Sequence, residues 1–144
     1  MNSNKFLIIN GPNLNMLGTR EPETYGSLTL DQIKEFTEKS LISDQVILEW
    51  YQSNIEGEIV TKIQEASKHS YKALIINPGA YSHTSVAIYD ALQMIKYPVI
   101  EVHLSNTYRR EEFRQVKLTA KASTIIMEGL GKIAYLTAVK TQLF

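Results

Sequence analysis

The sequence contains no cysteine, which excludes disulfide bridges, thiolate catalysis and cysteine-ligated metals, and leaves the redox compartment undetermined. It also lacks an excess of charge of either sign, because 15 lysines and arginines balance 15 aspartates and glutamates. No net field therefore favours nucleic acid or an anionic membrane as a partner. Any anionic ligand must be held by local groups.

Long hydrophobic runs are absent as well. No stretch approaches the roughly 18 apolar residues of a membrane span, and the start MNSNKFLIIN lacks the basic region and the long apolar stretch of a signal peptide. We therefore expect a cytoplasmic protein. The 144 residues make about one domain, and no repeat or linker-like segment divides them.

Cofactor motifs are missing too. No predicted strand is followed by GxGxxG or a Walker loop, and the GLG at residues 129–131 is better interpreted as a turn and helix start. The first and third predicted strands end in Asn10 and Asn77, so a receiver-type phosphoacceptor aspartate is absent there. None of the three histidines shares metal-ligand spacing with another. We expect neither a nucleotide cofactor nor a metal.

Five short apolar runs alternate with helical patterns, which is typical of βα units around a parallel sheet. Strands are predicted at residues 5–10, 46–51, 72–77, 98–103 and 122–127, and their continuous apolar character is typical of strands covered on both faces. Helices are predicted from about 27–29 to 40, from 56, from 84 or 85 until stopped by Pro98, from 109 to about 117, and from about 131 toward 142. The apolar surplus of the third helix suggests a buried or interfacial position.

Two helices have a predicted inward face: Ile59, Ile63 and Ala66 in the second, and Ile133, Leu136 and Val139 in the fifth. Five βα units predict an α/β fold, a flavodoxin-like three-layer sandwich with a five-stranded parallel sheet of order 2-1-3-4-5 and right-handed crossovers. Ligands of such sheets bind outside the carboxyl ends of the strands, here between strands one and three.

Polar segments follow the strands at that edge: residues 10–13, 77–83 and 101–106. They should converge on one crevice. His103 closes strand four, and Glu101 lies two positions earlier on the same pleat face, where it can orient or charge the imidazole. Acid/base use of His103 is the favoured interpretation, and a structural histidine is the alternative.

The segment at residues 10–26, NGPNLNMLGTREPETYG, is too long for an ordinary βα turn. It has apolar anchors, prolines and glycines, and is not composed like a disordered segment, so we predict an active-site lid at about residues 11–27 within a single catalytic domain, 1–144. A surface flap is the alternative. The anchors are Leu14, Met16, Leu17 and Tyr25, and the polar candidates on the lid are Asn13, Arg20, Glu23 and Tyr25.

Three further residues, outside the lid, are candidates or ambiguous. His83 would either contact a ligand or cap a helix, and Arg114 lies near the crevice although such residues are more often on the surface. Asp90, within the apolar third helix, suggests a partner across a subunit interface. Arg20 could stabilise a phenolate at Tyr25, whose ordinary pKa of about 10 is too high for a base at neutral pH.

Taken together, the motifs resemble those of type II 3-dehydroquinate dehydratases. The matching stretches are NGPNLNMLGTREPETYG at 10–26, QSNIEGEI at 52–59, INPGAYSHTSVAIYDAL at 76–92, and PVIEVHLSN with REEFR between 98 and 114. They keep the order and spacing of the family across nearly the whole chain. The fold of that family is the one predicted above.

The resemblance implies a cofactor-independent and metal-independent elimination of water from 3-dehydroquinate to give 3-dehydroshikimate through an enolate. Tyr25 would be the base, Arg20 would favour its ionised form, and His103, supported by Glu101, would protonate the leaving hydroxyl. Asn13 would stabilise the enolate through a water. The chemistry fits these residue types, since the reaction needs a base, an acid and a stabiliser of oxygen charge.

The resemblance also implies the substrate contacts and the assembly. The substrate carboxylate would bind Asn77, Leu104 and Ser105, the last two through backbone N–H groups, and the ring hydroxyls would bind His83, Arg114 and, from a neighbouring subunit, Asp90. The expected particle is a homododecamer, a tetramer of trimers. The same step serves the shikimate pathway of aromatic amino acid biosynthesis and quinate breakdown, and the sequence does not separate them.

The chain departs from the family pattern at residues 115–119, where histidine and serine are usual, and at Ile55. Lys117 in the first stretch either adds charge near the substrate or, as we favour, is solvated. The dehydratase class that uses a lysine Schiff base is disfavoured, because no lysine lies at a strand end facing the crevice. A non-catalytic module that binds a polyhydroxy acid is the competing function.

Overall fold

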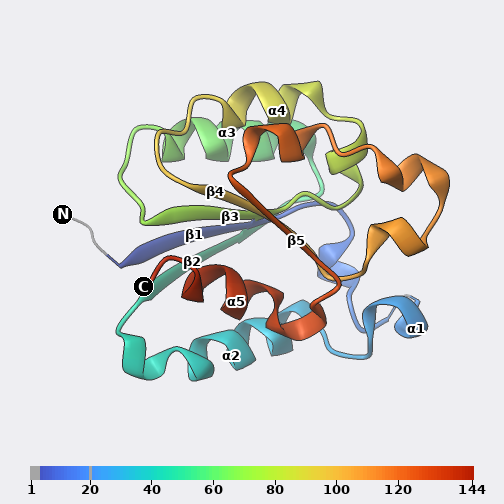
Figure 1. Cartoon of the computed structure of the whole chain (residues 1–144), viewed down its shortest axis with the longest axis horizontal. Coiled ribbons are helices and arrows are strands. Elements are labelled where there is room, and N and C mark those ends of the chain that lie inside the picture. The colour runs from blue at the N-terminus through green and yellow to red at the C-terminus, as the bar shows by residue number, and fades with distance from the viewer. Residues whose placement is uncertain (1–3, 20) are drawn as a thin grey trace.

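The structure is a computed structural model that describes residues 4–19 and 21–144, with the backbone but not the side chains of Thr24 and Tyr25. A parallel five-stranded sheet of order β2-β1-β3-β4-β5 forms its middle layer (Figure 1), as predicted. The strands are β1 (Lys5–Asn10), β2 (Ile47–Gln52), β3 (Ala73–Asn77), β4 (Val99–His103) and β5 (Ile125–Glu128).

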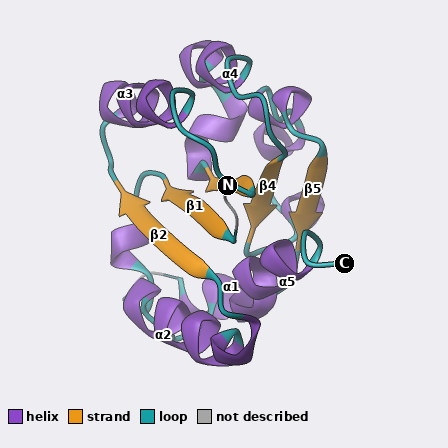
Figure 2. Ribbon diagram, turned by 90° about the vertical axis from the view of Figure 1, so that its left-hand side faces the viewer, coloured by secondary structure: helices purple, strands orange, loops and turns teal. Residues whose placement is uncertain are grey.

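Helices cover both faces of the sheet. Figure 2 shows α3 and α4 on one face and α2 and α5 on the other, which confirms the three-layer arrangement. The α-helices are α1 (Pro22–Tyr25), α2 (Leu30–Ser40), α3 (Glu56–Ala66), α4 (Val86–Leu92) and α5 (Ala134–Lys140). Short 3-10 turns lie at Leu14–Met16, Ile42–Asp44, Gly79–His83, Thr107–Arg109, Glu112–Gln115, Thr119–Ala122 and Gly131–Ile133.

The central strands are buried on both faces because their apolar residues alternate between two cores. Phe6 and Ile8 of β1 pack in the core on the α2/α5 side, whereas Leu7 and Ile9 pack in the core on the α3/α4 side. All four side chains are fully buried, so each face of the sheet gains roughly 25 cal/mol per Å² of apolar area removed from water. This rigid layer fixes the strand ends that carry the site.

Polar side-chain caps start α2 and α4 where the sequence predicted these helices to begin. Thr29 and Gln32 form a reciprocal capping box before α2, and the Ser85 hydroxyl accepts the Ile88 N–H at the start of α4. The predicted inward face of α3 is confirmed, because its three apolar members are buried.

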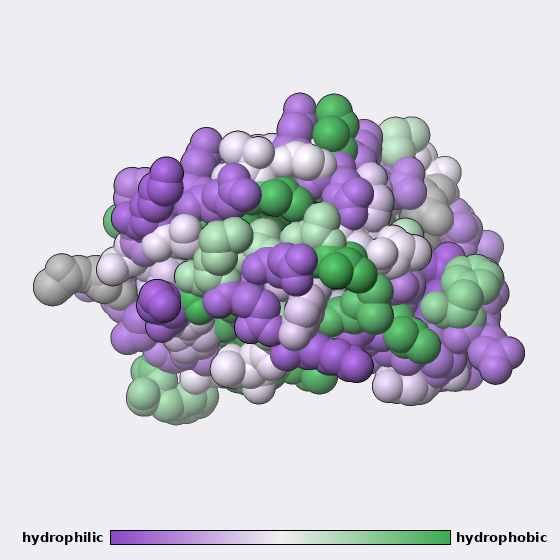
Figure 3. All heavy atoms as spheres, turned by 90° about the horizontal axis from the view of Figure 1, so that it is seen from above, coloured by the Kyte–Doolittle hydropathy of each residue, from purple (hydrophilic) through white to green (hydrophobic). Residues whose placement is uncertain are grey.

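The surface over α3 and α4 mixes apolar and polar side chains (Figure 3). Val86 of α4 and Met94 just beyond it are 59% and 44% exposed. Among the described residues, no helix has the length and apolar character needed to cross a membrane.

In the second half, one predicted helix is wrong and one predicted strand begins later than expected. The helix predicted over residues 109–117 is replaced by two 3-10 turns, because the backbone between them is extended at Arg110 (φ −117°, ψ −164°). β5 begins at Ile125 and not at residue 122, because residues Thr119–Ala122 form a 3-10 turn in which Thr119 bonds a carboxylate of β4.

The inward face predicted for the last helix is partly wrong. Ile133 is 39% exposed, whereas Ala134, Tyr135, Ala138 and Val139 are buried. The 3-10 turn at Gly131–Ile133 precedes α5 and shifts the helical phase, so the buried stripe begins one residue later than predicted.

Candidate active site

A cavity of about 100 Å³ lies at the carboxyl ends of β1, β3 and β4, where the sheet order predicted it. Seven of the residues predicted for the site line it: Asn13, Asn77, His83, His103, Leu104, Ser105 and Arg114. The three polar loops that follow these strands do converge. A larger groove of about 680 Å³ adjoins the cavity through Leu104 and Ser105 and reaches the predicted lid at Glu23 and Gly26.

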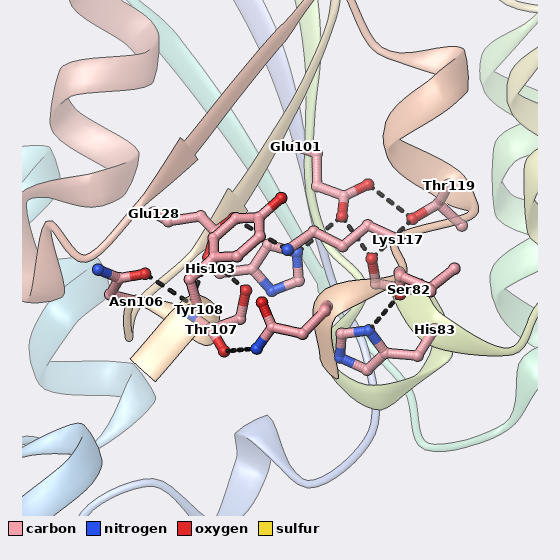
Figure 4. Close-up of polar contacts among 12 residues, drawn as sticks. Ser82, His83, Glu101, His103, Asn106, Thr107, Tyr108, Lys117, Thr119 and Glu128 are labelled. Atoms are coloured by element: carbon pink, nitrogen blue, oxygen red, sulfur yellow. Dashed lines mark hydrogen bonds and ion pairs between the residues drawn. The ribbon is translucent and has the colours of Figure 1, made fainter. Parts of the chain in front are cut away.

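Glu101 and His103 form a buried pair. The Glu101 side chain is fully buried, and one of its oxygens lies 2.7 Å from His103 Nε2. The carboxylate also accepts hydrogen bonds from Ser82 Oγ and Thr119 Oγ1, each at 2.6 Å (Figure 4). Because a carboxylate only accepts, Nε2 carries the proton and Nδ1 is left for another partner. Glu101 is thus placed where it can orient His103, and its role stays a prediction.

His83 lies beside this pair with its own orientation fixed. Its Nδ1 lies 2.7 Å from the Val116 carbonyl oxygen, so Nδ1 carries the proton and Nε2 is a lone-pair acceptor in the neutral ring. Burial lowers the pKa of His83, and the charges of His103, Arg114 and Lys117 lower it further against the opposing effect of the carbonyl. Ser85, not His83, caps α4, which leaves ligand contact as the better of the two predicted roles.

The loop after β4 offers donors for an anion. In the part of the chain that the structure describes, no backbone carbonyl accepts from the N–H groups of Leu104 or Ser105. Arg110 Nη1 lies 3.4 Å from Ser105 Oγ, and its Nη2 lies 3.5 Å from Glu21 of the predicted lid. Arg114 donates from Nε to Glu111 at 2.7 Å and lines the cavity. Arg110 was not singled out from the sequence.

Tyr135 of α5 reaches the strand ends from the α2/α5 side of the sheet. Its hydroxyl donates to Asn10 Oδ1 and accepts from Asn77 Nδ2 at 3.1 Å, and Asn77 Oδ1 accepts the Gly79 N–H at 3.2 Å. Burial raises the pKa of Tyr135, which keeps the hydroxyl protonated as a donor. This role was not predicted, because a tyrosine in a helical apolar pattern is usually a packing residue.

Asn13 is held at the entry of the predicted lid. It adopts a left-handed conformation (φ 71°), and its N–H donates to Asn54 Oδ1 at 2.9 Å. Gln52 Nε2 donates to the same oxygen at 3.2 Å and to the Gly11 carbonyl at 3.0 Å. A Cβ on Gly11 would lie 2.5 Å from the Pro78 carbonyl oxygen, so the close approach of these two loops requires glycine.

The predicted lid has structure of its own, including a 3-10 turn and α1. Leu14 and Leu17 are buried and confirm two predicted anchors, whereas Met16 is 49% exposed and is not one. Arg20 lies outside the described residues, as does the side chain of Tyr25, and their predicted roles stay predictions.

Two other expectations concern Lys117 and Asp90. The prediction that Lys117 is solvated is wrong: its side chain is 4% exposed, and Nζ pairs with Glu128 at 3.1 Å. Asp90 is exposed on α4, away from the cavity of its own chain. Within residues 4–19 and 21–144, no group of three or more histidines or acidic residues is arranged to hold a metal ion.

The fold and site thus define an enzyme-like crevice with a buried carboxylate–histidine pair at the switch point of a parallel sheet. The family model of class II dehydroquinases matches residues 4–143. The 3-dehydroquinate dehydratase of Clostridium botulinum (strain Hall) is 47% identical over 137 residues, which cover 95% of this chain and 92% of that protein. The 3-dehydroquinate dehydratase of Aliarcobacter butzleri is 50% identical over 131 residues, 91% of this chain and 79% of that one.

Solved structures give the same result. The type II dehydroquinase of Butyrivibrio crossotus superposes with a TM-score of 0.92 at 42% identity, covering 96% of each chain. That of Propionibacterium acnes gives a TM-score of 0.93 at 35% identity, covering 98% of this chain and 97% of the other. The chain therefore belongs to the class II dehydroquinase family of hydro-lyases.

Proposed function

We propose that the protein eliminates water from 3-dehydroquinate to give 3-dehydroshikimate through an enolate intermediate. The observation that carries the proposal is the buried Glu101–His103 pair. His103 lines the cavity, and its Nδ1 is not used in the bond to Glu101. The names of the relatives supply the substrate.

In the first step, the phenolate of Tyr25 takes the proton from the carbon next to the ketone, and the electron pair moves onto the ketone oxygen. Arg20 favours the ionised form of this tyrosine. A water held by Asn13 hydrogen-bonds the enolate oxygen. Donors placed where charge develops are usually the largest single contribution to such a step.

In the second step, the enolate collapses, the C–O bond of the leaving hydroxyl breaks, and His103 supplies the proton that makes the departing group water. For this His103 must start as an imidazolium, with protons on both nitrogens. The buried Glu101 carboxylate at 2.7 Å stabilises that cation, while Ser82 and Thr119 hold the carboxylate in place. A proton then passes from Tyr25 to His103, directly or through solvent, and restores both groups.

Substrate binding uses the remaining cavity residues. The carboxylate accepts from the N–H groups of Leu104 and Ser105 and from the amide of Asn77. His83, through its unprotonated Nε2, accepts a hydrogen bond from a ring hydroxyl, and Arg114 donates to one.

Asp90 completes the site from a neighbouring subunit in a trimer-based dodecamer. Its exposure on α4, next to exposed Val86, suits a residue that acts on another copy. Sedimentation should give a trimer-based particle, and a stable monomer with full activity would contradict this arrangement. We further propose a cytoplasmic enzyme acting in the shikimate pathway, in quinate breakdown, or in both.

One assay tests the reaction. The product contains an enone conjugated to a carboxylate and absorbs in the ultraviolet, whereas the substrate does not. Purified protein mixed with 3-dehydroquinate should produce that absorbance catalytically. Heat released by binding in a calorimeter, with no growth of absorbance, would favour the non-catalytic binding module instead.

A further inference from the structure

Residues 115–119, called the strap here, cross the site and hold it at several points. Each of four strap residues bonds a different part: Gln115 Nε2 donates to the Thr107 carbonyl (2.9 Å), Val116 O accepts from His83 Nδ1 (2.7 Å), Leu118 N donates to the Ser82 carbonyl (2.7 Å), and Thr119 Oγ1 donates to Glu101 (2.6 Å). The position of the strap therefore sets the orientation of both active-site histidines.

Lys117, the middle residue of the strap, is buried. Its Nζ lies 3.1 Å from Glu128 Oε2 and 4.1 Å from the centroid of the Tyr108 ring. The other Glu128 oxygen accepts from Thr107, from the backbone N–H at 2.8 Å and from the hydroxyl at 2.5 Å. A buried lysine is costly unless paired, and here the pairing joins the strap to the end of β5.

The lysine side chain spans the end of β4. Leu118, the next residue, bonds Ser82 in the turn after β3, whereas Glu128 is the register partner of His103 in β5. Since β4 lies between β3 and β5, Lys117 reaches across the strand end that carries His103, as Figure 4 shows. The strap is thus tied on the β3 side by backbone and on the β5 side by this ion pair.

We propose that Lys117 is a positioning residue for substrate binding: its ion pair with Glu128 holds the Val116 carbonyl against His83 Nδ1, so that Nε2 of His83 is presented as a hydrogen-bond acceptor. The proposal rests on the proposed function for the identity of the hydroxyl that binds there. The fixed tautomer of His83 does not depend on it.

The surrounding charges act in the same direction. His103 from β4, Arg114 from the preceding 3-10 turn and Lys117 itself all face His83 and, after burial, lower its pKa. The Glu101 carboxylate bonds His103, Ser82 and Thr119 and is not among the groups that shift the pKa of His83. Lys117 therefore helps to keep His83 neutral while holding its partner.

The test compares Lys117→Met with Lys121→Met. Both remove one lysine charge, but Lys121 is exposed and four positions further along. Lys117→Met should raise KM about 3- to 10-fold, the range of one neutral hydrogen bond, with kcat much less affected. The acid-side fall of kcat/KM should move to higher pH, because a cation near His83 is gone. Lys121→Met should behave as wild type.

The double variant Lys117→Met with Glu128→Gln leaves no unpaired buried charge and guards against loss of folding. It should keep the raised KM, because the link between the strap and β5 is still broken. The acid-side fall of its kcat/KM should return toward the wild-type pH, because the net charge is restored. The proposal would be overturned if Lys117→Met and Lys121→Met had equal KM values and equal pH profiles of kcat/KM. A double variant with wild-type KM would overturn it as well.

A second measurement is independent of turnover. Long-range proton–nitrogen NMR correlations in protein labelled with ¹⁵N-histidine should show His83 protonated at Nδ1 in wild type and a tautomer mixture in Lys117→Met. An unchanged tautomer in the variant would refute the proposal even if the enzyme is active. Absence of dehydration by wild type would overturn the proposed function and leave this readout in force.

Discussion

The rings of His83 and His103 lie nearly parallel, with centroids 6.3 Å apart and planes inclined by 22°. One nitrogen of each ring is fixed by a different kind of acceptor: a neutral carbonyl for His83 and a carboxylate for His103. Of the two, only His103 is therefore paired with a carboxylate. The two histidines can act side by side as a neutral acceptor and a proton donor.

Replacing His103 with alanine tests its role as the acid. We expect kcat to fall about 100-fold or more, within the usual range for general acid catalysis, with KM changed little because the binding groups of the cavity remain. Steady-state kinetics on 3-dehydroquinate gives both numbers. A kcat close to wild type would remove His103 from the mechanism.

The predicted lid is tested through Tyr25 and Arg20. Tyr25→Phe should abolish turnover and keep substrate binding, since only a hydroxyl is lost. Arg20→Ala should lower kcat at neutral pH and move the basic limb of its pH profile upward, because a nearby guanidinium favours the phenolate. Arg20→Lys should recover little if planar geometry matters. A large loss of rate in Arg20→Ala with no movement of that limb would instead assign Arg20 to positioning the substrate or the lid.

Tyr135→Phe tests the hydroxyl that joins the strand ends. The change leaves buried groups of Asn10 and Asn77 without a partner, which should cost about 1–3 kcal/mol of unfolding free energy. Tyr97→Phe is the matched control, because the hydroxyl of Tyr97 donates to the Ala66 carbonyl in a less buried place. Denaturant melts that show equal losses for both variants would argue against a special role for Tyr135.

Acid stability should depend on Glu49. Burial raises the pKa of Glu49, but hydrogen bonds from Tyr71 and Lys62 and the charge of Lys5 outweigh it and hold the pKa below its usual 4.5. A carboxyl whose pKa is lowered by folding contributes stability above the unfolded pKa and loses it as the pH falls through the folded pKa.

The unfolding free energy of Glu49→Gln should therefore fall less steeply than that of wild type between about pH 6 and pH 3. Glu35→Gln, which breaks an exposed pair with Lys39, should leave the slope unchanged. Parallel curves for wild type and Glu49→Gln would show that the Glu49 cluster does not contribute to acid unfolding.

The sheet order and the convergence of the site could be predicted from the sequence because both follow from local patterns. Apolar runs and polar strand ends locate β1, β3 and β4, and the two-residue spacing of Glu101 and His103 places them on one face. Parallel topology then brings the ends together. None of this requires knowledge of long-range side-chain contacts.

The parts that could not be predicted depend on such contacts. Lys117 looks solvated in sequence, but its partner Glu128 is brought to it by the register of β5 with β4. Residues 109–117 have helical spacing, yet contacts such as that of Gln115 with the Thr107 carbonyl accompany two short turns in place of one helix. Tertiary hydrogen bonds override local propensity in both places.

The contacts of the Tyr135 hydroxyl also limit when the site can form during protein synthesis. Asn10 and Asn77, at the ends of two early strands, find their shared partner on α5, 125 and 58 residues later. During synthesis, both strands therefore leave the ribosome before Tyr135 has been made. Asn10 and Asn77 can gain this shared partner only once residue 135 has been translated and α5 has docked.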